Sequence, residues 1–492
     1  MQRAVTRAAV RNRLGVCAGV LQRQPRQFAC SVVAGAAQHL GAHAGKEADD
    51  NELVPKVSVV AAASVSVARS GLRVPKVNMM EGFVATTDNR APAEPFPAAA
   101  TASMLNHFNS KCPIRRHEVS HELAEQMGKY AARQPAPIPL RFLHEFGTLA
   151  RSTEKRLLAS EWLKEELPVR LARRVRELEM LPRKLCNMPS ILRVRQTYQA
   201  SFCDIVDFPA LRTDADPEAK IRAFAALLED IYARHKHVAR DVACGLLEFR
   251  EYNPTILLDQ EEKLQVFLTH FFKSRIAIRL MIGHYLACFE EVPGFRGLIN
   301  LKCRPEQRIR AAAEVVQRVA RKFYCTANVP EVCIVGKVDA EFPYIDEFVY
   351  FCLREALKNA MRSMIEHHGD VSHAGSYPPI VVVIAEGDED VSIRISDRGM
   401  GFPLRDMGKI FAFGYSTTNM SGVLQRLQHN ESANVFDNSE DGPIAGLGYG
   451  LPLARLYATY FGGNMTVMSM EDWGTDVLYQ FPNLERLGFA SS

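Results

Sequence analysis

Four short segments, in a fixed order along the C-terminal part of the chain, constrain its fold most. They are Glu355-Ala-Leu-Lys-Asn359-Ala-Met-Arg362, Asp397-Arg-Gly-Met-Gly401, Gly446-Leu-Gly-Tyr-Gly450 and Gly474-Thr-Asp476. A helix brings Glu355 and Asn359 to one face, because they stand four residues apart. Each glycine cluster falls at the predicted end of a helix or strand, where backbone can closely approach a ligand. Together the segments predict an ATP site.

The first segment offers the groups that phosphoryl transfer needs. The amide oxygen of Asn359 is a hard donor of the kind that Mg²⁺ prefers. Glu355, one turn earlier, is placed to accept a proton from an attacking hydroxyl as general base. Lys358 and Arg362 can either hold phosphate or form salt bridges, and the sequence leaves both open. A solvated polar helix face is the simpler alternative, and the other three segments argue against it.

The second and fourth segments predict the adenine end of the site. Asp397 ends a strand of alternating character, so its carboxylate can reach the adenine amino group. Gly399 and Gly401 would let the base lie against backbone. Thr475, after Gly474, would complete the adenine contact, although an ordinary hairpin turn also explains this dipeptide.

The long stretch between Gly401 and Gly446 contains Ser416-Thr-Thr418 and a polar insert over residues 419–441. Such irregular segments inside a compact domain are usually functional or disordered, and here we expect a lid over ATP. The glycines after it would present backbone N–H groups to phosphate at the start of a helix. The nucleotide contacts expected in this region are Ser416, Thr417, Gly446, Leu447, Gly448, Tyr449, Gly450 and Leu451.

These motifs resemble the GHKL ATPases, a fold shared by histidine kinases, heat-shock chaperone ATPases and type II topoisomerases. Within that fold, the sequence is similar to the mitochondrial 2-oxo acid dehydrogenase kinases, which phosphorylate protein serines. The resemblance covers roughly residues 110–485. The blocks that carry it are SIRISDRGMG (392–401), GLGYGLPLARLYATY (446–460), SMEDWGTDV (469–477), ELPVRLA (166–172) and SRIAIR (274–279).

The resemblance divides between two members of the family. Asp207-Phe-Pro209, Phe342-Pro343 and the run from Lys358 to Arg362 with Glu366-His367 look closer to the branched-chain 2-oxo acid dehydrogenase kinase. By contrast, Tyr415-Ser-Thr417 and Leu456-Tyr-Ala458 look closer to the pyruvate dehydrogenase kinases. Both clients stay open, with the branched-chain client slightly favoured.

The resemblance implies a protein-serine kinase that uses Mg-ATP to inactivate the decarboxylase subunit of a 2-oxo acid dehydrogenase complex. It also implies a homodimer that docks on a lipoyl domain of the acyltransferase core. In the family, the residue that matches Asn359 binds Mg²⁺ and the residue that matches Glu355 is the general base. The resemblance also implies that Asp397 binds adenine. Met400 replaces a glycine that is usual there. A potassium site near the lid is uncertain, because Ala412 stands where the branched-chain enzymes have Asp.

A further implication is a regulatory pocket for small carboxylates in the N-terminal half. The residues that match it are Tyr198, Ser201, His235, Arg275 and Arg279. Two arginines one turn apart can clamp an anion, although a buried salt-bridge network would explain them equally well. His237 replaces an Asp that is frequent in the family.

Two other functions remain as alternatives. A histidine kinase of the same superfamily would need a phosphoacceptor histidine on a dimerisation helix, and His235, within Arg-His-Lys-His, is a poor candidate. The second alternative is a catalytically inactive ATP-binding scaffold, and the presence of Glu355 together with Asn359 argues against it.

The first 46 residues carry seven basic side chains and no acidic one. This is typical of a mitochondrial transit peptide, although a disordered basic tail would look similar. We expect cleavage and residence in the mitochondrial matrix. Because the whole chain has a formal charge of +4, the remainder would be mildly acidic, which argues against a nucleic-acid partner. No apolar run is long enough to span a membrane, and the eleven scattered cysteines indicate neither zinc nor disulfides.

The expected fold is α+β, with an N-terminal four-helix bundle followed by a GHKL-type α/β sandwich on a mixed sheet. The bundle rests on long segments with apolar residues three and four apart, such as Ile221 to Phe249 and Glu261 to Phe289. The predicted divisions are a transit peptide (1–46), a low-complexity linker (47–108), a regulatory and lipoyl-docking bundle (109–300) and the kinase domain (301–486). In the last, we expect a linking helix from Pro305, a strand 332–335, helices 345–367 and 450–461, and hairpins 380–395 and 465–481.

Overall fold

The structure, a computed structural model, describes residues 121–138, 143, 146–147, 152–213, 216–252, 261–290, 292–369, 377–416 and 447–483. The predicted transit peptide and linker lie outside the described residues. So do Thr417, Gly446 and the polar insert of the predicted lid.

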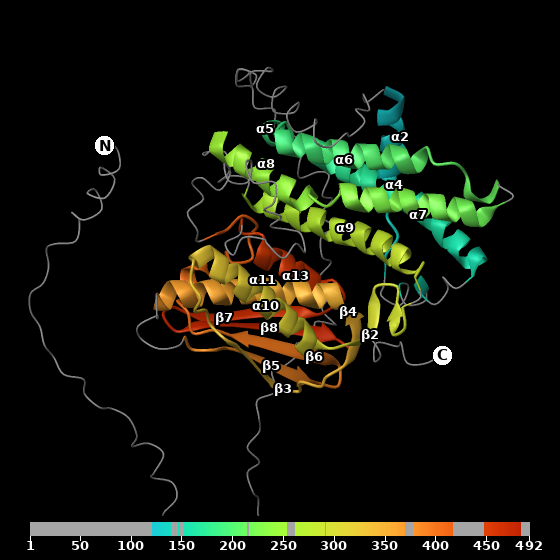
Figure 1. The fold of residues 1–492 in the computed structure, drawn as a ribbon. Helices are drawn as coiled ribbons and strands as arrows, with labels where there is room; N and C mark the ends of the chain where they lie inside the picture. The colour runs from blue at the N-terminus through green and yellow to red at the C-terminus, as the bar shows by residue number, and fades with distance from the viewer. Residues whose placement is uncertain are drawn as a thin grey trace, which may run out of the picture. The chain divides into compact units, whose positions relative to one another are not determined.

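The first part of the described chain is helical (Figure 1). Its helices are α2 (His121–Ala132), α4 (Thr153–Glu179), α5 (Arg183–Cys186), α6 (Pro189–Val206), α7 (Pro217–Arg234), α8 (Val238–Tyr252) and α9 (Glu261–Ala287), with a 3₁₀ turn at Leu211–Thr213. Helix starts follow capping rules: the side chain of Ser152 accepts from the backbone of Lys155, and Asp216 accepts from Ala219 ahead of a proline at the first helical position. Helix α4 packs on α6, α7 and α9, and α8 packs on α6.

The predicted continuous helix over 221–249 is wrong, because it divides into α7 and α8 at His235–His237. The carbonyl oxygens of His235 and Lys236 each accept a hydrogen bond from Nη2 of Arg275, at 3.3 Å. The His235 side chain is buried in this turn, where Nε2 lies 2.9 Å from Ser201 Oγ. These long-range partners replace the helical hydrogen bonds that the local pattern favours.

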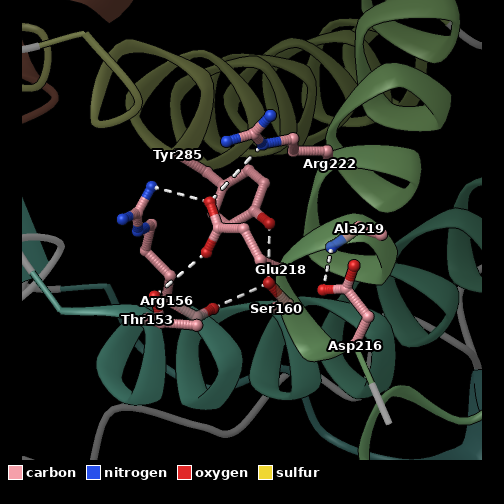
Figure 2. A network of polar contacts seen from close by, with 8 residues as sticks. All are labelled: Thr153, Arg156, Ser160, Asp216, Glu218, Ala219, Arg222 and Tyr285. Atoms are coloured by element: carbon pink, nitrogen blue, oxygen red, sulfur yellow. Dashed lines mark hydrogen bonds and ion pairs between the residues drawn. The ribbon is translucent and has the colours of Figure 1, made fainter. Parts of the chain in front are cut away.

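A polar network ties together the starts of α4 and α7 and the end of α9 (Figure 2). The Glu218 carboxylate on α7 accepts from Thr153 Oγ1 at 3.0 Å and from Arg156 Nη1 at 3.4 Å, both on α4. Inside the bundle, Ser160 Oγ on α4 lies 2.6 Å from Tyr285 Oη on α9. Because Glu218 makes two of these contacts, the network fixes the relative placement of the helix ends better than isolated surface pairs would.

The second part is an α/β sandwich. Its elements are β1 (Phe295–Arg296), β2 (Ile299–Cys303), α10 (Pro305–Tyr324), β3 (Val332–Gly336), β4 (Phe342–Ile345), α11 (Asp346–His368), β5 (Ile380–Glu386), β6 (Asp390–Ser396), a 3₁₀ turn (Leu404–Asp406), α13 (Gly450–Thr459), β7 (Asn464–Met470) and β8 (Gly474–Pro482). Five strands form a mixed sheet in the order β3-β5-β6-β8-β7, in which only the β3–β5 pair is parallel. Helices α10, α11 and α13 cover one face of it (Figure 1). The fold class is therefore α+β with a mixed sheet, as predicted.

Two features of this part differ from expectation. Helix α10, predicted as a link, packs along α11 and belongs to the helical layer. A small antiparallel sheet, β1-β2-β4, was not predicted. The two layers are joined through the core, where Tyr479 Oη on β8 donates to the carbonyl oxygen of Cys352 on α11 at 3.0 Å. Among the described residues, no helix has the length and apolar character of a membrane span.

Candidate functional site

A cavity of about 390 Å³ lies along one face of α11 and is closed by the loops after β6 and before α13. Its size falls within the range of small-molecule sites, roughly 300–1,000 Å³. Ten of the predicted nucleotide-site residues line it: Glu355, Asn359, Arg362, Gly401, Ser416, Leu447, Gly448, Tyr449, Gly450 and Leu451. The structure thus brings together segments that are almost a hundred residues apart in sequence.

The Glu355 carboxylate is buried on the cavity wall between two cations. Oε1 lies 3.0 Å from Lys358 Nζ and 3.4 Å from Arg354 Nη2. The other oxygen, Oε2, packs against Gly450, where a Cβ atom would lie only 2.4 Å from it. Lys358 therefore forms a salt bridge within α11, and because it also lines the cavity, its role in holding phosphate stays a prediction. The first residue of α13 must be small to leave room for the carboxylate.

Asn359 lies one turn further along α11 and is exposed on the same cavity. Arg362 is half-buried, and its Nε atom lies 2.8 Å from Glu366 Oε1. In the described part of the chain, no group of three or more His, Cys, Asp or Glu side chains could hold a metal ion by itself. The side-chain oxygen of Asn359 suits a magnesium ion that takes one protein oxygen and fills its other positions with phosphate and water.

Asp397 lies at the end of β6, behind the cavity wall rather than on it. Its Oδ1 atom accepts from the backbone N–H of Gly399 at 2.9 Å. Burial raises the pKa of Asp397 to about 6, against the opposing effect of backbone hydrogen bonds from Gly399 and Thr475. Thr475 is also buried, with Oγ1 2.9 Å from Ser469 Oγ. The predicted adenine group of Asp397, Gly399 and Thr475 thus forms one cluster adjoining the cavity.

The glycines serve the packing of the protein itself. At Gly399 a Cβ would lie 2.1 Å from Ser363 Oγ, so this glycine lets the loop approach α11. Gly401 has a φ of +62° and faces the carbonyl oxygen of Met470, which a Cβ would approach to 2.0 Å. Both conformation and space therefore require glycine at position 401. The sequence argument assigned these glycines to nucleotide contact alone.

Several cavity residues were not singled out from the sequence. Phe351, Ser363 and Glu366 line it from α11, and Ser363 Oγ also accepts from the backbone of Met400 at 3.0 Å. They share a helix face with Glu355 and Asn359, so extending the three- and four-residue spacing in both directions could have found them. The contact of Arg354 with Glu355 could not have been found from helical spacing, because adjacent residues do not share a helix face.

The residues matching a regulatory pocket form a buried cluster in the helical part. The rings of Tyr198 and His235 meet edge to face at 4.6 Å, and His235 Nε2 is hydrogen-bonded to Ser201. Burial, followed by the charge of Arg275, lowers the pKa of His235 to about 3, so the ring is neutral at physiological pH. The guanidinium of Arg279 stacks over Tyr232 at 3.8 Å.

The two arginines of this cluster line a cavity. It measures about 310 Å³ and lies between the helical part and the helices over the sheet. Lys236 and Glu347 add one further cation and one carboxylate to its lining. Tyr198 lies deeper in the bundle, and its hydroxyl has no hydrogen-bond partner among the described residues.

A mixed sheet covered on one face by helices, with a Glu/Asn helix and glycine turns around one cavity, defines a GHKL-type ATPase domain. A family model described as histidine kinase-, DNA gyrase B- and HSP90-like ATPase matches residues 346–485. A second, described as mitochondrial branched-chain alpha-ketoacid dehydrogenase kinase, matches residues 137–307.

Curated relatives extend this similarity across both parts of the chain. The mitochondrial [pyruvate dehydrogenase (acetyl-transferring)] kinase of Arabidopsis thaliana is 33% identical over 369 residues, 74% of this chain and 94% of the relative. Isozyme 4 of that kinase from Mus musculus is 32% identical over 71% of this chain and 81% of its own length, and that from Homo sapiens is 31% identical over 72% and 82%. The chain belongs to the mitochondrial 2-oxo acid dehydrogenase kinase family and is an ATP-dependent protein kinase.

Proposed function

We propose that this protein phosphorylates a serine of the decarboxylase subunit of a mitochondrial 2-oxo acid dehydrogenase complex and thereby inactivates it. The observation that carries the proposal is the arrangement of Glu355, Asn359 and the Gly448–Gly450 turn around one cavity. This arrangement combines a potential base, a metal ligand and a phosphate-facing backbone, which direct transfer to a hydroxyl requires.

Each residue has a proposed role. Glu355 accepts the proton of the substrate hydroxyl, and its contacts with Lys358 and Gly450 fix the carboxylate in place. Asn359 gives its side-chain oxygen to Mg²⁺, which, when bound, supplies charge stabilisation to the phosphates. Asp397 accepts from the adenine amino group, with Gly399, Gly401 and Thr475 shaping its surroundings. Arg362, Ser416 and Leu447 to Leu451 line the same cavity and would contact the phosphates, and Thr417 and Gly446 stay predicted contacts outside the described residues.

The client is proposed to be the branched-chain complex. The family model over residues 137–307 carries the branched-chain description and supports this choice. The curated relatives are pyruvate dehydrogenase kinases, so pyruvate dehydrogenase is the specific alternative. We further infer docking on the lipoyl domain of the acyltransferase core, a homodimer and residence in the matrix after removal of residues 1–46.

We also propose that residues 109–300 form a regulatory and lipoyl-docking domain and residues 301–486 the kinase domain. In the first, a small carboxylate would bind near Arg275 and Arg279, which line the smaller cavity. A potassium site near residue 412 stays a prediction. It would lack a side-chain ligand at this position, because the side chain of Ala412 is a methyl group.

One experiment tests the function and its alternatives together. The full chain is incubated with γ-labelled ATP and either the pyruvate or the branched-chain decarboxylase, each with its lipoyl-bearing core. We expect acid-stable phosphoserine on one decarboxylase, formed roughly 10²- to 10⁴-fold more slowly with Glu355→Gln. Acid-labile label on the chain itself would support a histidine kinase instead. ATP binding without any transfer would support a scaffold.

A further inference from the structure

Side chains of α8 and α9 hydrogen-bond to the segment that supports the wall of the ATP cavity. Gln265, in the second turn of α9, makes two hydrogen bonds with the backbone of Phe413, which is 148 residues away in sequence. Its Nε2 group donates to the Phe413 carbonyl oxygen at 3.0 Å, and its Oε1 atom accepts from the Phe413 N–H at 2.7 Å. A carboxamide thus pairs with one residue's backbone as a neighbouring β-strand would.

A second contact reinforces this pairing at the next residue. Arg250, in the last turn of α8, donates from Nη1 to the Gly414 carbonyl oxygen at 3.1 Å. Gly414 has a φ of +79°, and a Cβ there would lie 3.0 Å from this guanidinium. Glu261 accepts from Gln265 Nε2 at 2.9 Å, which orients the carboxamide. Two side chains of α8 and α9 therefore contact two consecutive residues of the kinase part, and Glu261 orients one of the two.

The held segment is joined directly to the cavity wall. The Gly414 N–H donates to the carbonyl oxygen of Gly448 at 3.0 Å. The Phe413 ring stacks on Phe272 of α9 at 5.1 Å and lies 5.5 Å from the ring of Tyr449. Gly448 and Tyr449 line the ATP cavity, so displacement of Phe413 would move the backbone proposed to face phosphate.

We propose that Gln265 is a positioning residue for nucleotide binding, acting through Phe413 and Gly414 on the Gly448–Tyr449 wall. The inference rests on the proposed use of this cavity for ATP. Gln265 itself does not line the cavity, so its effect on nucleotide affinity is transmitted rather than direct. The helical part is therefore needed to complete the ATP site, in addition to its proposed regulatory role.

The test compares three variants of the full chain. Gln265→Leu removes both hydrogen bonds with little change in size. Gln265→Glu keeps the acceptor for the Phe413 N–H but places a carboxylate oxygen against the carbonyl. The matched control is Glu262→Gln, because Glu262 is exposed on the same turn of α9. Each is assayed for amide hydrogen exchange in peptides spanning 405–416 and 447–453, for the Kd of a fluorescent ATP analogue, and for the thermal midpoint.

We expect Gln265→Leu to speed exchange in both peptides and to raise the Kd about tenfold. This change corresponds to the net free energy of one to two neutral hydrogen bonds. Gln265→Glu should lose at least as much protection and affinity, because its second carboxylate oxygen would face the Phe413 carbonyl oxygen and the Glu261 carboxylate. Glu262→Gln should match the parent. A residue that only stabilises the fold would lower the thermal midpoint with the Kd of the folded fraction unchanged, and that result would overturn the proposal. If Gln265→Leu does not fold, the Kd of Gln265→Glu against Glu262→Gln decides. Phosphate transfer to a decarboxylase by the parent tests the proposed function separately.

Discussion

Replacing Gly450 by Ala should separate catalytic activity from stability. A Cβ at this position would lie 2.4 Å from Glu355 Oε2 and 3.4 Å from its Cδ. Because ordinary contacts begin near 3.4 Å, Oε2 must move by about 1 Å. The obstacle is the end of a flexible side chain, so the carboxylate should turn away while the backbone stays. Oε1 carries the contact with Lys358, and that ion pair can persist.

Working from this displacement, we expect kcat to fall about 100-fold, because a misplacement of about 1 Å at a reacting group has that effect. Stability should not fall in parallel. Gly450 is the first residue of α13 and has no positive φ, and Ala favours a helix over Gly by up to about 1 kcal/mol. The free energy of unfolding should therefore stay level or rise slightly.

The assay is the initial rate of phosphate transfer, paired with denaturant unfolding. The matched control is Gly128→Ala in α2, where a Cβ would meet nothing within 4 Å. This control should gain stability and keep the parental rate. A Gly450→Ala protein with the parental kcat would refute the assignment of Glu355 as a precisely positioned base.

Three further predictions concern the ATP site. Glu355→Gln should leave the Kd of Mg-ATP near the parental value while transfer, measured as initial rate, falls roughly 10²- to 10⁴-fold. Asn359→Ala should instead weaken Mg-ATP binding in a fluorescence titration, and raised magnesium should partly restore it. If neither the substitution nor the magnesium concentration changes the affinity, Asn359 is not a ligand. For Asp397, whose pKa is raised to about 6, ATP affinity should fall as the pH drops through 6, because only the ionised carboxylate accepts from adenine. In the ATP-free protein, the contribution of Asp397 to the free energy of unfolding should change in the opposite direction. Its raised folded-state pKa stabilises the fold at low pH, and this contribution is lost as the pH rises through 6. Asp397→Asn should abolish both effects.

Much of the sandwich could be predicted from local pattern. The hairpins β5–β6 and β7–β8 alternate in burial and turn at glycine-containing loops, so both were located to within about two residues. The small sheet could not be found this way. β1 has two residues, and β4, Phe342–Ile345, is buried at all four positions, which removes the alternation that identifies a strand. The break between α7 and α8 depends on Arg275, about forty residues further on.

The candidate site shows the same division between local and distant causes. Helical spacing correctly put Glu355, Asn359 and Arg362 on one cavity. It could not show that Lys358 pairs with Glu355, because a lysine three residues from a carboxylate is as often solvated as paired. Nor could it show that Gly399 is needed against Ser363, or that Gln265 holds Phe413. These contacts join elements whose proximity only the fold creates.

The contacts of Arg275 and Arg279 show how many of their N–H groups remain for the carboxylate of the proposed regulatory pocket. Nη2 of Arg275 donates to two backbone carbonyl oxygens, and Nη1 of Arg279 donates to the carbonyl oxygen of Tyr232. A guanidinium has five N–H donors, so each retains some for a carboxylate. In the described part of the chain, Arg275 Nε is buried and has no partner. Charge argues the same way, because among the described residues neither arginine forms a salt bridge with a carboxylate. A small carboxylate bound between them would therefore neutralise the buried charge of Arg275, whereas a neutral ligand of the same size would not.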